Sequence, residues 1–306
     1  MRSIILDVDT GVDDAFALLF AARHPEINLL GVTCVDGNTN LPQVCENTLQ
    51  VLEMAGAKDI PVSAGAHKPL IGESLYAEHV HGKDGLGNLS SRSHGRKLDP
   101  RHAVVLIRDL IEESQEPVTL VPVGPLTNIA LFISTFPDTA RKLERIVIMG
   151  GSASTGNATA TAEFNIWHDP EAAHMVFESG IPITMYGLDV FYEVKVGPND
   201  LAYLRSRGSE AARFAADLVE FMLGHMGPEI TLGDYGAVAA TLDPSVITTE
   251  TMYVAVDITN GPNRGQTICD KRPDHPLFQL NRVGKKAEIA LTVDKDRLVQ
   301  DWLKVF

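Results

Sequence analysis

Short apolar runs alternate with stretches of helical periodicity from residue 3 to residue 186, and this alternation restricts the fold more than any other feature of the sequence. The apolar runs have the length and β-branched content of buried strands; they lie at Ser3–Val8, Asn28–Val35, Ile60–Ser63, Val118–Val123, Arg145–Met149 and Ile183–Tyr186. Strands that alternate with helices are joined by right-handed crossovers, which align them in parallel. The pattern therefore predicts an α/β fold: a doubly wound, mostly parallel central sheet with helices on both faces.

Helices are expected between these strands, at Asp13–Arg23, Leu41–Ala55, His102–Glu113, Thr127–Phe136 and Pro170–Ser179. After Tyr186 the pattern changes to two further helices, Ser209–Leu223 and Gly236–Leu242, and then to a small antiparallel C-terminal hairpin formed by Thr251–Ile258 and Thr267–Asp270. The polar segment Ala66–Arg101 lacks periodicity, as long functional loops often do. Because no linker-like segment separates two halves, we expect residues 1–306 to form a single domain.

The charge balance limits the kinds of partner that the chain can have. Lysine and arginine number 26 against 40 acidic residues, and the resulting net charge of −14 disfavours nucleic acid and anionic membranes. Asp7 and Asp9 interrupt the first apolar run before a signal peptide could form, and the run Ala15–Ala22 is far shorter than the ~20 residues of a membrane span. Three widely spaced cysteines suit a reducing compartment. We therefore expect a cytoplasmic protein with no nucleic-acid or membrane partner.

Four acidic residues follow one another closely in the segment DVDTGVDD, at the end of the first predicted strand. Strand alternation places Asp7 and Asp9 on one face, while Asp13 and Asp14 fall in the first turn of the next helix. Helix capping explains one of these acids, but four carboxylates at one strand end repel one another unless a cation neutralises them. Oxygen ligands without His or Cys indicate a hard cation, Ca²⁺ or Mg²⁺.

Other strand ends carry small polar segments of the same kind. These are VDGNTN at residues 35–40, VGPLTN at residues 123–128, and residues 149–173, which contain Asn157, Glu163 and Asn165. The preference of Asn and Gly for turns explains one such loop, but not several at equivalent strand ends. Because open α/β sheets bind ligands at the carboxyl ends of their strands, these side chains predict a site for a small polyhydroxylated molecule.

Together, these motifs resemble the nucleoside hydrolase family, the inosine–uridine-preferring nucleoside N-ribohydrolases. The resemblance covers nearly the whole chain and runs through DVDTGVDD, GNTN, HGKDGLGN, VGPLTNIAL, MGG, AEFNIWHDPEAA and GDYGAVAATLDP. It implies a Ca²⁺-dependent enzyme that hydrolyses the N-glycosidic bond of purine or pyrimidine ribonucleosides to free base and ribose. It also implies a homodimer or homotetramer.

The resemblance assigns roles to individual residues. It implies that Ca²⁺ is held by Asp9, Asp14, the main-chain carbonyl of Val123 and Asp234, and that Asp9 is the general base for the attacking water. The ribose side is implied to consist of Asp13, Asn38, Met149, Asn157, Glu163, Asn165 and Asp234. The nucleobase side is implied to consist of His81, Phe164, His225 and Tyr235. Trp167 and His168 are interpreted as packing residues.

One position departs from the family pattern. Many members carry a His, as proton donor to the leaving base, where this chain has Gly233. His81, His225 and Tyr235 are candidate replacements, and an aromatic ring stacked on the base is another route. The sequence does not decide between purine and pyrimidine nucleosides.

Two other functions remain as alternatives at the level of sequence. A calcium-dependent nucleoside-binding protein without turnover would use the same residues, and only Gly233 favours it. A haloacid-dehalogenase-type phosphatase also begins with a strand and a D-x-D motif, but it expects Thr or Val where this chain has Gly11.

Overall fold

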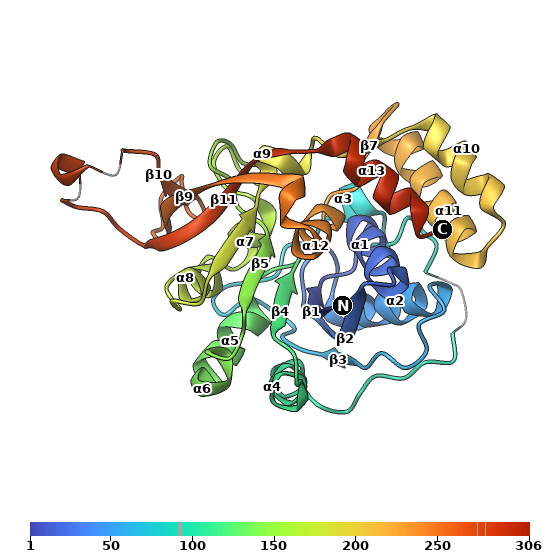
Figure 1. The fold of residues 1–306 in the computed structure, drawn as a ribbon, viewed down its shortest axis with the longest axis horizontal. Coiled ribbons are helices and arrows are strands. Elements are labelled where there is room, and N and C mark those ends of the chain that lie inside the picture. Colours follow the sequence, from blue (N-terminus) through green and yellow to red (C-terminus); the bar gives the residue numbers. More distant parts are fainter. Residues whose placement is uncertain (91–93, 274, 279) are drawn as a thin grey trace.

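The computed structural model describes residues 1–306 except 91–93, 274 and 279, and its described strands form one large sheet beside a small two-stranded ribbon (Figure 1). The spatial order of the large sheet is β10-β9-β11-β6-β5-β4-β1-β2-β3. Its strands are β1 (Arg2–Val8), β2 (Ile27–Cys34), β3 (Val62–Ala64), β4 (Val118–Pro122), β5 (Arg145–Met149), β6 (Ile183–Tyr186), β9 (Ile247–Val256), β10 (Thr267–Asp270) and β11 (Lys285–Val293).

The six N-terminal strands all pair in parallel, as the sequence predicts. In this register Asp7 of β1 lies between Thr33 of β2 and Pro122 of β4. The carboxyl ends of these strands therefore meet at one edge, which brings together the polar segments that follow β1, β2, β4 and β5.

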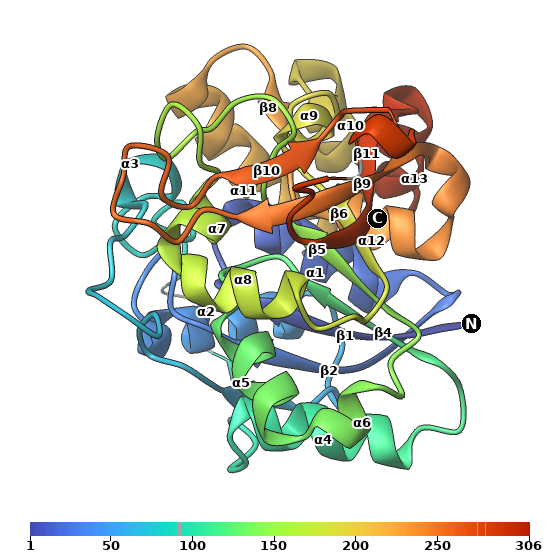
Figure 2. The same ribbon diagram turned by 90° about the vertical axis from the view of Figure 1, so that its left-hand side faces the viewer.

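Helices cover both faces of the sheet (Figures 1 and 2). Ile4 and Leu6 of β1 belong to one buried core and Ile5 to the other, as strand alternation requires. The first core includes α1 (Val12–Arg23), α2 (Leu41–Met54), α11 (Glu210–Met226), α12 (Tyr235–Leu242) and α13 (Lys295–Lys304). The second face carries α4 (Ala103–Glu113), α5 (Thr127–Thr135), α6 (Pro137–Ala140) and α8 (Pro170–Phe177). The predicted doubly wound architecture is confirmed.

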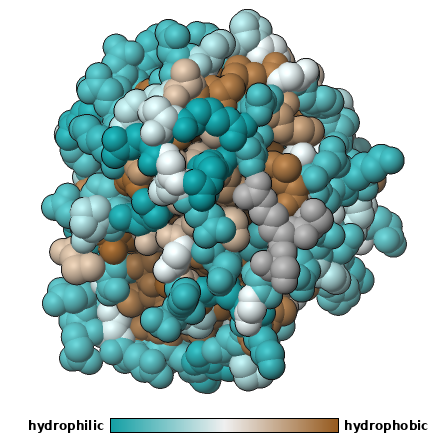
Figure 3. All heavy atoms as spheres, turned by 90° about the vertical axis from the view of Figure 1, so that its right-hand side faces the viewer, coloured by the Kyte–Doolittle hydropathy of each residue, from teal (hydrophilic) through white to brown (hydrophobic). Residues whose placement is uncertain are grey.

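Several short elements were not predicted because they are too short to show a period. They are α3 (Glu78–His81), α7 (Phe164–His168), α9 (Leu188–Phe191), the two 3₁₀ turns Pro244–Val246 and Pro276–Phe278, and the ribbon strands β7 (Lys195–Val196) and β8 (Ile230–Thr231). The longer helices α10 (Pro198–Arg207) and α13 were also missed, as was the short helix α6. The helix α10 packs against α11. Figure 3 shows the side of the molecule that carries α10 and α11, on the right in Figure 1, and this face is mainly hydrophilic.

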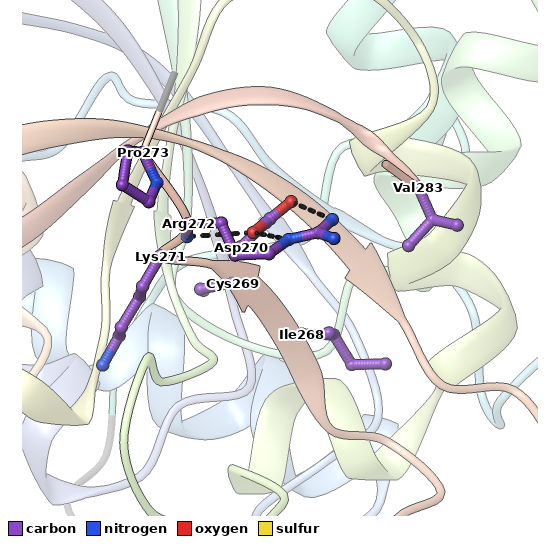
Figure 4. A pocket seen from close by; sticks show the side chains of 7 residues that line it. All are labelled: Ile268, Cys269, Asp270, Lys271, Arg272, Pro273 and Val283. Carbon is purple, nitrogen blue, oxygen red and sulfur yellow. Dashed lines mark hydrogen bonds and ion pairs between the residues drawn. The ribbon is translucent and has the colours of Figure 1, made fainter. Parts of the chain in front are cut away.

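The C-terminal hairpin is confirmed as an antiparallel pair of β9 and β10, but it is not a separate small unit. The strand β11, which was not predicted, lies between β9 and β6; it runs parallel to β6 and antiparallel to β9. The hairpin therefore extends the central sheet as an arm, on the left in Figure 1. Beside β10 the arm has an open hollow in which the Arg272 guanidinium binds the Asp270 carboxylate at 2.7 Å (Figure 4).

Among the described residues, we find no helix with both the length and the apolar character that a membrane crossing requires.

Candidate active site

A cavity of about 380 Å³ opens at the carboxyl ends of the parallel strands. Its walls come from the segments after β1, β2, β4 and β5, together with α3, α7 and the end of α11. Most of the predicted site residues line it, namely Asp13, Asn38, His81, Val123, Met149, Asn157, Glu163, Phe164, Asn165 and Asp234. The structure thus brings together residues that are more than 200 positions apart in the sequence.

Asp9 lies directly after β1 and is 1% exposed. Its Oδ2 accepts a hydrogen bond of 2.7 Å from the backbone N–H of Asn38. Its Oδ1 has no hydrogen-bond partner among the described residues. Burial, and then the charge of Asp14, raises the pKa of the Asp9 carboxyl well above its usual range. The free Oδ1 is therefore a buried acceptor that needs a cation, a water molecule or a proton.

Asp13, Asp14 and Asp234 form an acidic cluster in which one carboxylate oxygen from each lies within 4.8 Å of the others. Burial, followed by the charge of Asp13, raises the pKa of Asp14 to about 7. Burial, followed by the charges of Asp13 and Asp14, raises the pKa of Asp234 well above its usual range. These carboxylates repel one another, and a bound cation relieves such repulsion.

The observed cluster differs from the predicted ligand set in one carboxylate. The predicted metal ligands are Asp9, Asp14, Asp234 and the carbonyl of Val123. The cluster of converging carboxylates contains Asp13 in place of Asp9. Asp14 is held firmly, because it accepts hydrogen bonds from the backbone N–H groups of Asp9 at 3.1 Å and Gly11 at 2.8 Å. All the available ligand atoms are oxygens, so the donor set fits a hard cation.

The cavity wall also holds amide and carboxylate groups predicted for the ribose. Glu163 caps α7, with Oε1 accepting from Asn165 N–H at 2.9 Å and Oε2 accepting from Gly151 N–H at 2.9 Å. Burial raises the pKa of Glu163 to about 7. The Asn165 amide donates to the Val123 carbonyl at 2.8 Å, and Asn157 Oδ1 accepts from Phe164 N–H at 2.8 Å. These bonds fix the wall before any ligand arrives.

His81 lies in α3, against the first turn of α1. Its Nδ1 accepts a hydrogen bond of 3.2 Å from the Val12 N–H, so the neutral imidazole carries its proton on Nε2. Burial lowers the pKa of His81, which keeps the ring neutral at physiological pH. His81 can therefore donate a hydrogen bond through Nε2.

Two residues predicted for the nucleobase side lie elsewhere. Tyr235 is fully buried, packs against Phe20 at 4.7 Å between ring centroids, and donates its hydroxyl to the Leu298 carbonyl at 2.9 Å. The prediction for Tyr235 is wrong because α12 begins at this residue and turns its side chain toward α1. His225 is exposed and does not line the cavity; its Nε2 lies 2.9 Å from the His79 carbonyl.

Several residues that line the cavity were not predicted: Leu75, Tyr76, Phe191, Tyr192, Met222, Met226, Thr231 and Trp167. Trp167, interpreted as a packing residue, lies 6.1 Å from Phe164 between ring centroids and also lines the cavity. His168 is buried beside Asp36, in agreement with its interpretation as a packing residue. Phe191 and Tyr192 follow β6 just as the polar segments follow the other strands, so the strand-end rule could have found them.

Gly233 has a φ of +54°, a left-handed conformation that favours glycine. A Cβ atom at this position would lie 2.8 Å from the Phe191 ring and 2.9 Å from Asp13 Cβ. The local packing therefore has no room for the His that many family members carry here.

A doubly wound sheet that gathers carboxylates and amides around a cavity at its carboxyl edge defines an α/β enzyme for a small polyhydroxylated substrate. The chain belongs to the inosine-uridine preferring nucleoside hydrolase family, whose model matches residues 4–300. The predicted family is confirmed, and the chain is a nucleoside hydrolase that acts on N-glycosyl compounds. This finding excludes the phosphatase and the binding protein without turnover.

Individual relatives agree with this family. The pyrimidine-specific ribonucleoside hydrolase RihA of Shewanella sp. (strain MR-7) is 39% identical over 97% of this chain and 94% of its own. RihB of Escherichia coli (strain SE11), also described as pyrimidine-specific, is 38% identical over 96% of this chain and 94% of its own. Among solved structures, a purine-preferring ribonucleoside hydrolase from Gardnerella vaginalis superposes with a TM-score of 0.90 at 32% identity, over 99% of this chain and 98% of the other.

Proposed function

We propose that this nucleoside hydrolase depends on Ca²⁺ and that Asp9 is its general base. The observation that carries the proposal is the buried Oδ1 of Asp9, which has no hydrogen-bond partner among the described residues. The backbone N–H of Asp9 donates to Asp14 of the acidic cluster at 3.1 Å. Asp9, Asp14, Asp234 and the carbonyl of Val123 would hold the cation. When bound, Ca²⁺ would offset the repulsion among the carboxylates and lower the pKa of a nearby water molecule.

Different residues of the chain would then have different roles in hydrolysis of the N-glycosidic bond. Asp9 takes the proton of the attacking water through its free Oδ1, while the Asn38 N–H holds its other oxygen. As the sugar gains oxocarbenium character, the carboxylate of Glu163 favours the positive charge. The ribose-side residues orient the sugar through its hydroxyl groups; these are Asp13, Asn38, Met149, Asn157, Glu163, Asn165 and Asp234.

For the base, we propose a preference for pyrimidine ribonucleosides such as uridine and cytidine. Relatives named as pyrimidine-specific are 38–40% identical to this chain, whereas the solved structures named as purine-preferring and inosine-guanosine hydrolases are 32% and 28% identical. His81 and Phe164 line the cavity on the side assigned to the base, where His81 Nε2 offers a donor and Phe164 an aromatic face.

A panel of ribonucleosides tests the proposed base preference. Uridine, cytidine, inosine and adenosine are incubated with the enzyme and Ca²⁺, and the released ribose is measured as reducing sugar. Release from uridine and cytidine at least about 10-fold faster than from the purine nucleosides would support the preference, since leaving one buried polar group without its partner costs about 1–3 kcal/mol. Equal or faster release from inosine would refute it.

The role of Asp9 is tested by Asp9→Asn. The amide keeps the size of the side chain but cannot accept the proton, so we expect turnover to fall by about 10³-fold while the melting temperature stays close to that of the wild type. Wild-type rates in this variant would rule out Asp9 as the base.

We also propose that the enzyme acts in the cytoplasm, as a single domain that assembles into a homodimer or homotetramer. The even spread of the family match over residues 4–300 supports the single domain, and the acidic net charge of −14 suits a cytoplasmic enzyme. Size-exclusion chromatography with light scattering would show the assembly directly.

A further inference from the structure

The segment at residues 151–155, which follows β5, is held by side chains along its whole length. Each of its five N–H groups donates to a side chain, and among the described residues none donates to a backbone carbonyl. The acceptors are Glu163, Thr267 and Asp189 for the first three N–H groups, and the Ser152 hydroxyl for the last two. The conformation of this segment therefore depends on these side chains, since a buried N–H without a partner costs free energy.

Glu163 connects the 151–155 segment to the cavity. Its carboxylate lines the cavity and accepts the Gly151 N–H through Oε2 at 2.9 Å. Its other described hydrogen bonds come from α7, which Glu163 itself caps: Oε1 accepts from Asn165 N–H at 2.9 Å and Oε2 from Ile166 N–H at 3.2 Å. Among the described residues, the Gly151 N–H is thus the one donor that ties this carboxylate to a part of the fold outside α7.

Thr267, the first residue of β10, holds the same segment from the arm. Its hydroxyl accepts the Ser152 N–H at 2.9 Å and donates to the Ser152 carbonyl at 2.7 Å. Thr267 is 4% exposed, and a Cβ atom on Gly151 would lie 2.9 Å from its Cγ2. The Cys269 thiol lies 3.9 Å from the same carbonyl, but a thiol is a weak donor. One hydroxyl therefore satisfies both backbone groups of the residue that follows Gly151.

The turn between β9 and β10 fixes Thr267 relative to the cavity wall. The Arg264 guanidinium binds both oxygens of the Glu171 carboxylate in α8, at 2.7 and 2.8 Å. A Cβ atom on Gly265 would lie 2.8 Å from the Cα atom of Trp167, whose side chain lines the cavity. Figure 2 shows this turn beside α7. The start of β10 is therefore packed against the same part of the wall that carries the cavity carboxylate.

We propose that Thr267 is a positioning residue for Glu163, although Thr267 itself does not line the cavity. Through Ser152 and Gly151 it holds the carboxylate at the sugar; this inference rests on the proposed function, in which Glu163 favours the positive charge that develops on the ribose. A fixed carboxylate stabilises that charge without having to reorient during the reaction. Without the Thr267 hydroxyl, Ser152 loses two hydrogen bonds, Gly151 shifts, and the carboxylate loses its external donor.

The test compares two substitutions of Thr267. Thr267→Val keeps the shape of the side chain but loses both hydrogen bonds, and we expect kcat on the best nucleoside to fall by about 10-fold, because small displacements of a catalytic group are costly. Thr267→Ser keeps the hydroxyl and should stay within about 3-fold of the wild type. Thr251→Val is the matched control: it removes another hydroxyl of the arm, which binds Glu288 on the exposed surface, and should keep the wild-type kcat.

A double variant shows whether Thr267 acts through the carboxylate. In the Glu163→Gln background the charge is absent, so adding Thr267→Val should change kcat by less than about 3-fold. A purely structural role predicts the same 10-fold loss in both backgrounds. Melting temperatures show that each variant is folded at the assay temperature, and Thr267→Ala takes the place of Thr267→Val if the latter does not fold.

An unchanged kcat in Thr267→Val, an equal loss in Thr267→Ser, or a full loss in the Glu163→Gln background would each overturn the inference. Glu163→Gln alone tests the proposed role of the carboxylate, and we expect its kcat to fall by about 10²-fold. A wild-type rate in Glu163→Gln would overturn that role together with this inference. A slow Glu163→Gln beside a fully active Thr267→Val would overturn the inference alone.

Discussion

At the scale of single residues, the Asp9 carboxylate fits into a slot between two glycines. A Cβ atom on Gly37 would lie 2.1 Å from Asp9 Oδ2, and one on Gly124 would lie 2.7 Å from Oδ1. Neither glycine has a positive φ, so the requirement for glycine here is the space that Asp9 occupies. The orientation of the Asp9 carboxylate, which we propose as the general base, is therefore set by the absence of two side chains.

This slot leads to a prediction for Gly37→Ala. The added methyl group must displace the Asp9 carboxylate, and a misplacement of about 1 Å in a catalytic group costs on the order of 10²-fold in rate. We expect kcat to fall by about that factor, as measured with the best nucleoside. Gly95→Ala is the control, because a Cβ atom there meets no atom of the described residues within 4 Å. An active Gly37→Ala variant would show that Asp9 tolerates displacement.

The thiols provide a second prediction at this scale. Cys34 and Cys45 are buried, and burial raises the pKa of the half-buried Cys269 to about 12. Because Cys34 and Cys45 are inaccessible and the reactive thiolate form of Cys269 is scarce at pH 8, alkylation of the native protein by iodoacetamide should be slow at all three positions. The rate at Cys269 should rise with pH throughout the alkaline range, whereas all three thiols should react quickly in guanidinium. Mass spectrometry of the alkylated peptides measures each site, and fast native labelling at pH 8 would contradict the expectation.

At the scale of elements, Asp169 joins three parts of the chain around the start of α8. Its Oδ1 accepts from Ala172 N–H at 3.1 Å and caps the helix, while Oδ2 accepts from the Leu70 N–H and the Thr127 hydroxyl. All of these groups are at least partly buried, so removing the carboxylate leaves several donors without a partner.

We expect Asp169→Ala to lower the free energy of unfolding by about 3 kcal/mol, one part from the lost cap and the rest from the unsatisfied donors. Ser209→Ala removes the cap of α11, whose hydroxyl accepts only from Ala212 N–H among the described groups, and should cost about 1 kcal/mol. Urea denaturation of both variants measures the difference. Equal losses would mean that Asp169 acts as a helix cap alone.

The comparison of sequence and structure also belongs to this scale. Arg145–Met149 and Ile183–Tyr186 were predicted to the residue, because a short apolar run with turn residues on both sides is a local signal. The strand β11 was not predicted, since it follows a long polar segment and finds its place only by pairing with β6 and β9. The direction of a side chain is equally non-local: Tyr235 follows a site residue in sequence but points into the core because α12 packs on α1.

At the scale of the whole molecule, the sheet turns a scattered set of acids into one site. Asp9 and Asp14 follow β1, whereas Asp234 arrives from beyond residue 230 on the loop between β8 and α12. Folding therefore brings like charges together, which raises the pKa values of Asp14 and Asp234 and costs free energy. A strand order that places these segments side by side is stable only if other interactions, or a bound cation, offset this repulsion.

This balance predicts that Ca²⁺ stabilises the folded protein. A ligand that binds only the native state adds about 2.7 kcal/mol at a free concentration of 100 times its Kd, so Ca²⁺ should raise the melting temperature and EGTA should reverse the rise. Mg²⁺ should act more weakly, because it prefers a strict octahedral geometry and gives up its water reluctantly.

Two substitutions make this last prediction specific to the site. Asp234→Asn removes one charge from the acidic cluster, so the protein without cation should become more stable while the shift caused by Ca²⁺ becomes smaller. Glu116→Gln removes one charge from an exposed position outside the site, and it should leave both quantities as in the wild type. Differential scanning calorimetry in EGTA and in Ca²⁺ measures the two quantities for each variant. An identical Ca²⁺ shift in the wild type and in Asp234→Asn would place the cation away from the cluster, because a ligand at the site cannot lose a neighbouring carboxylate without losing affinity.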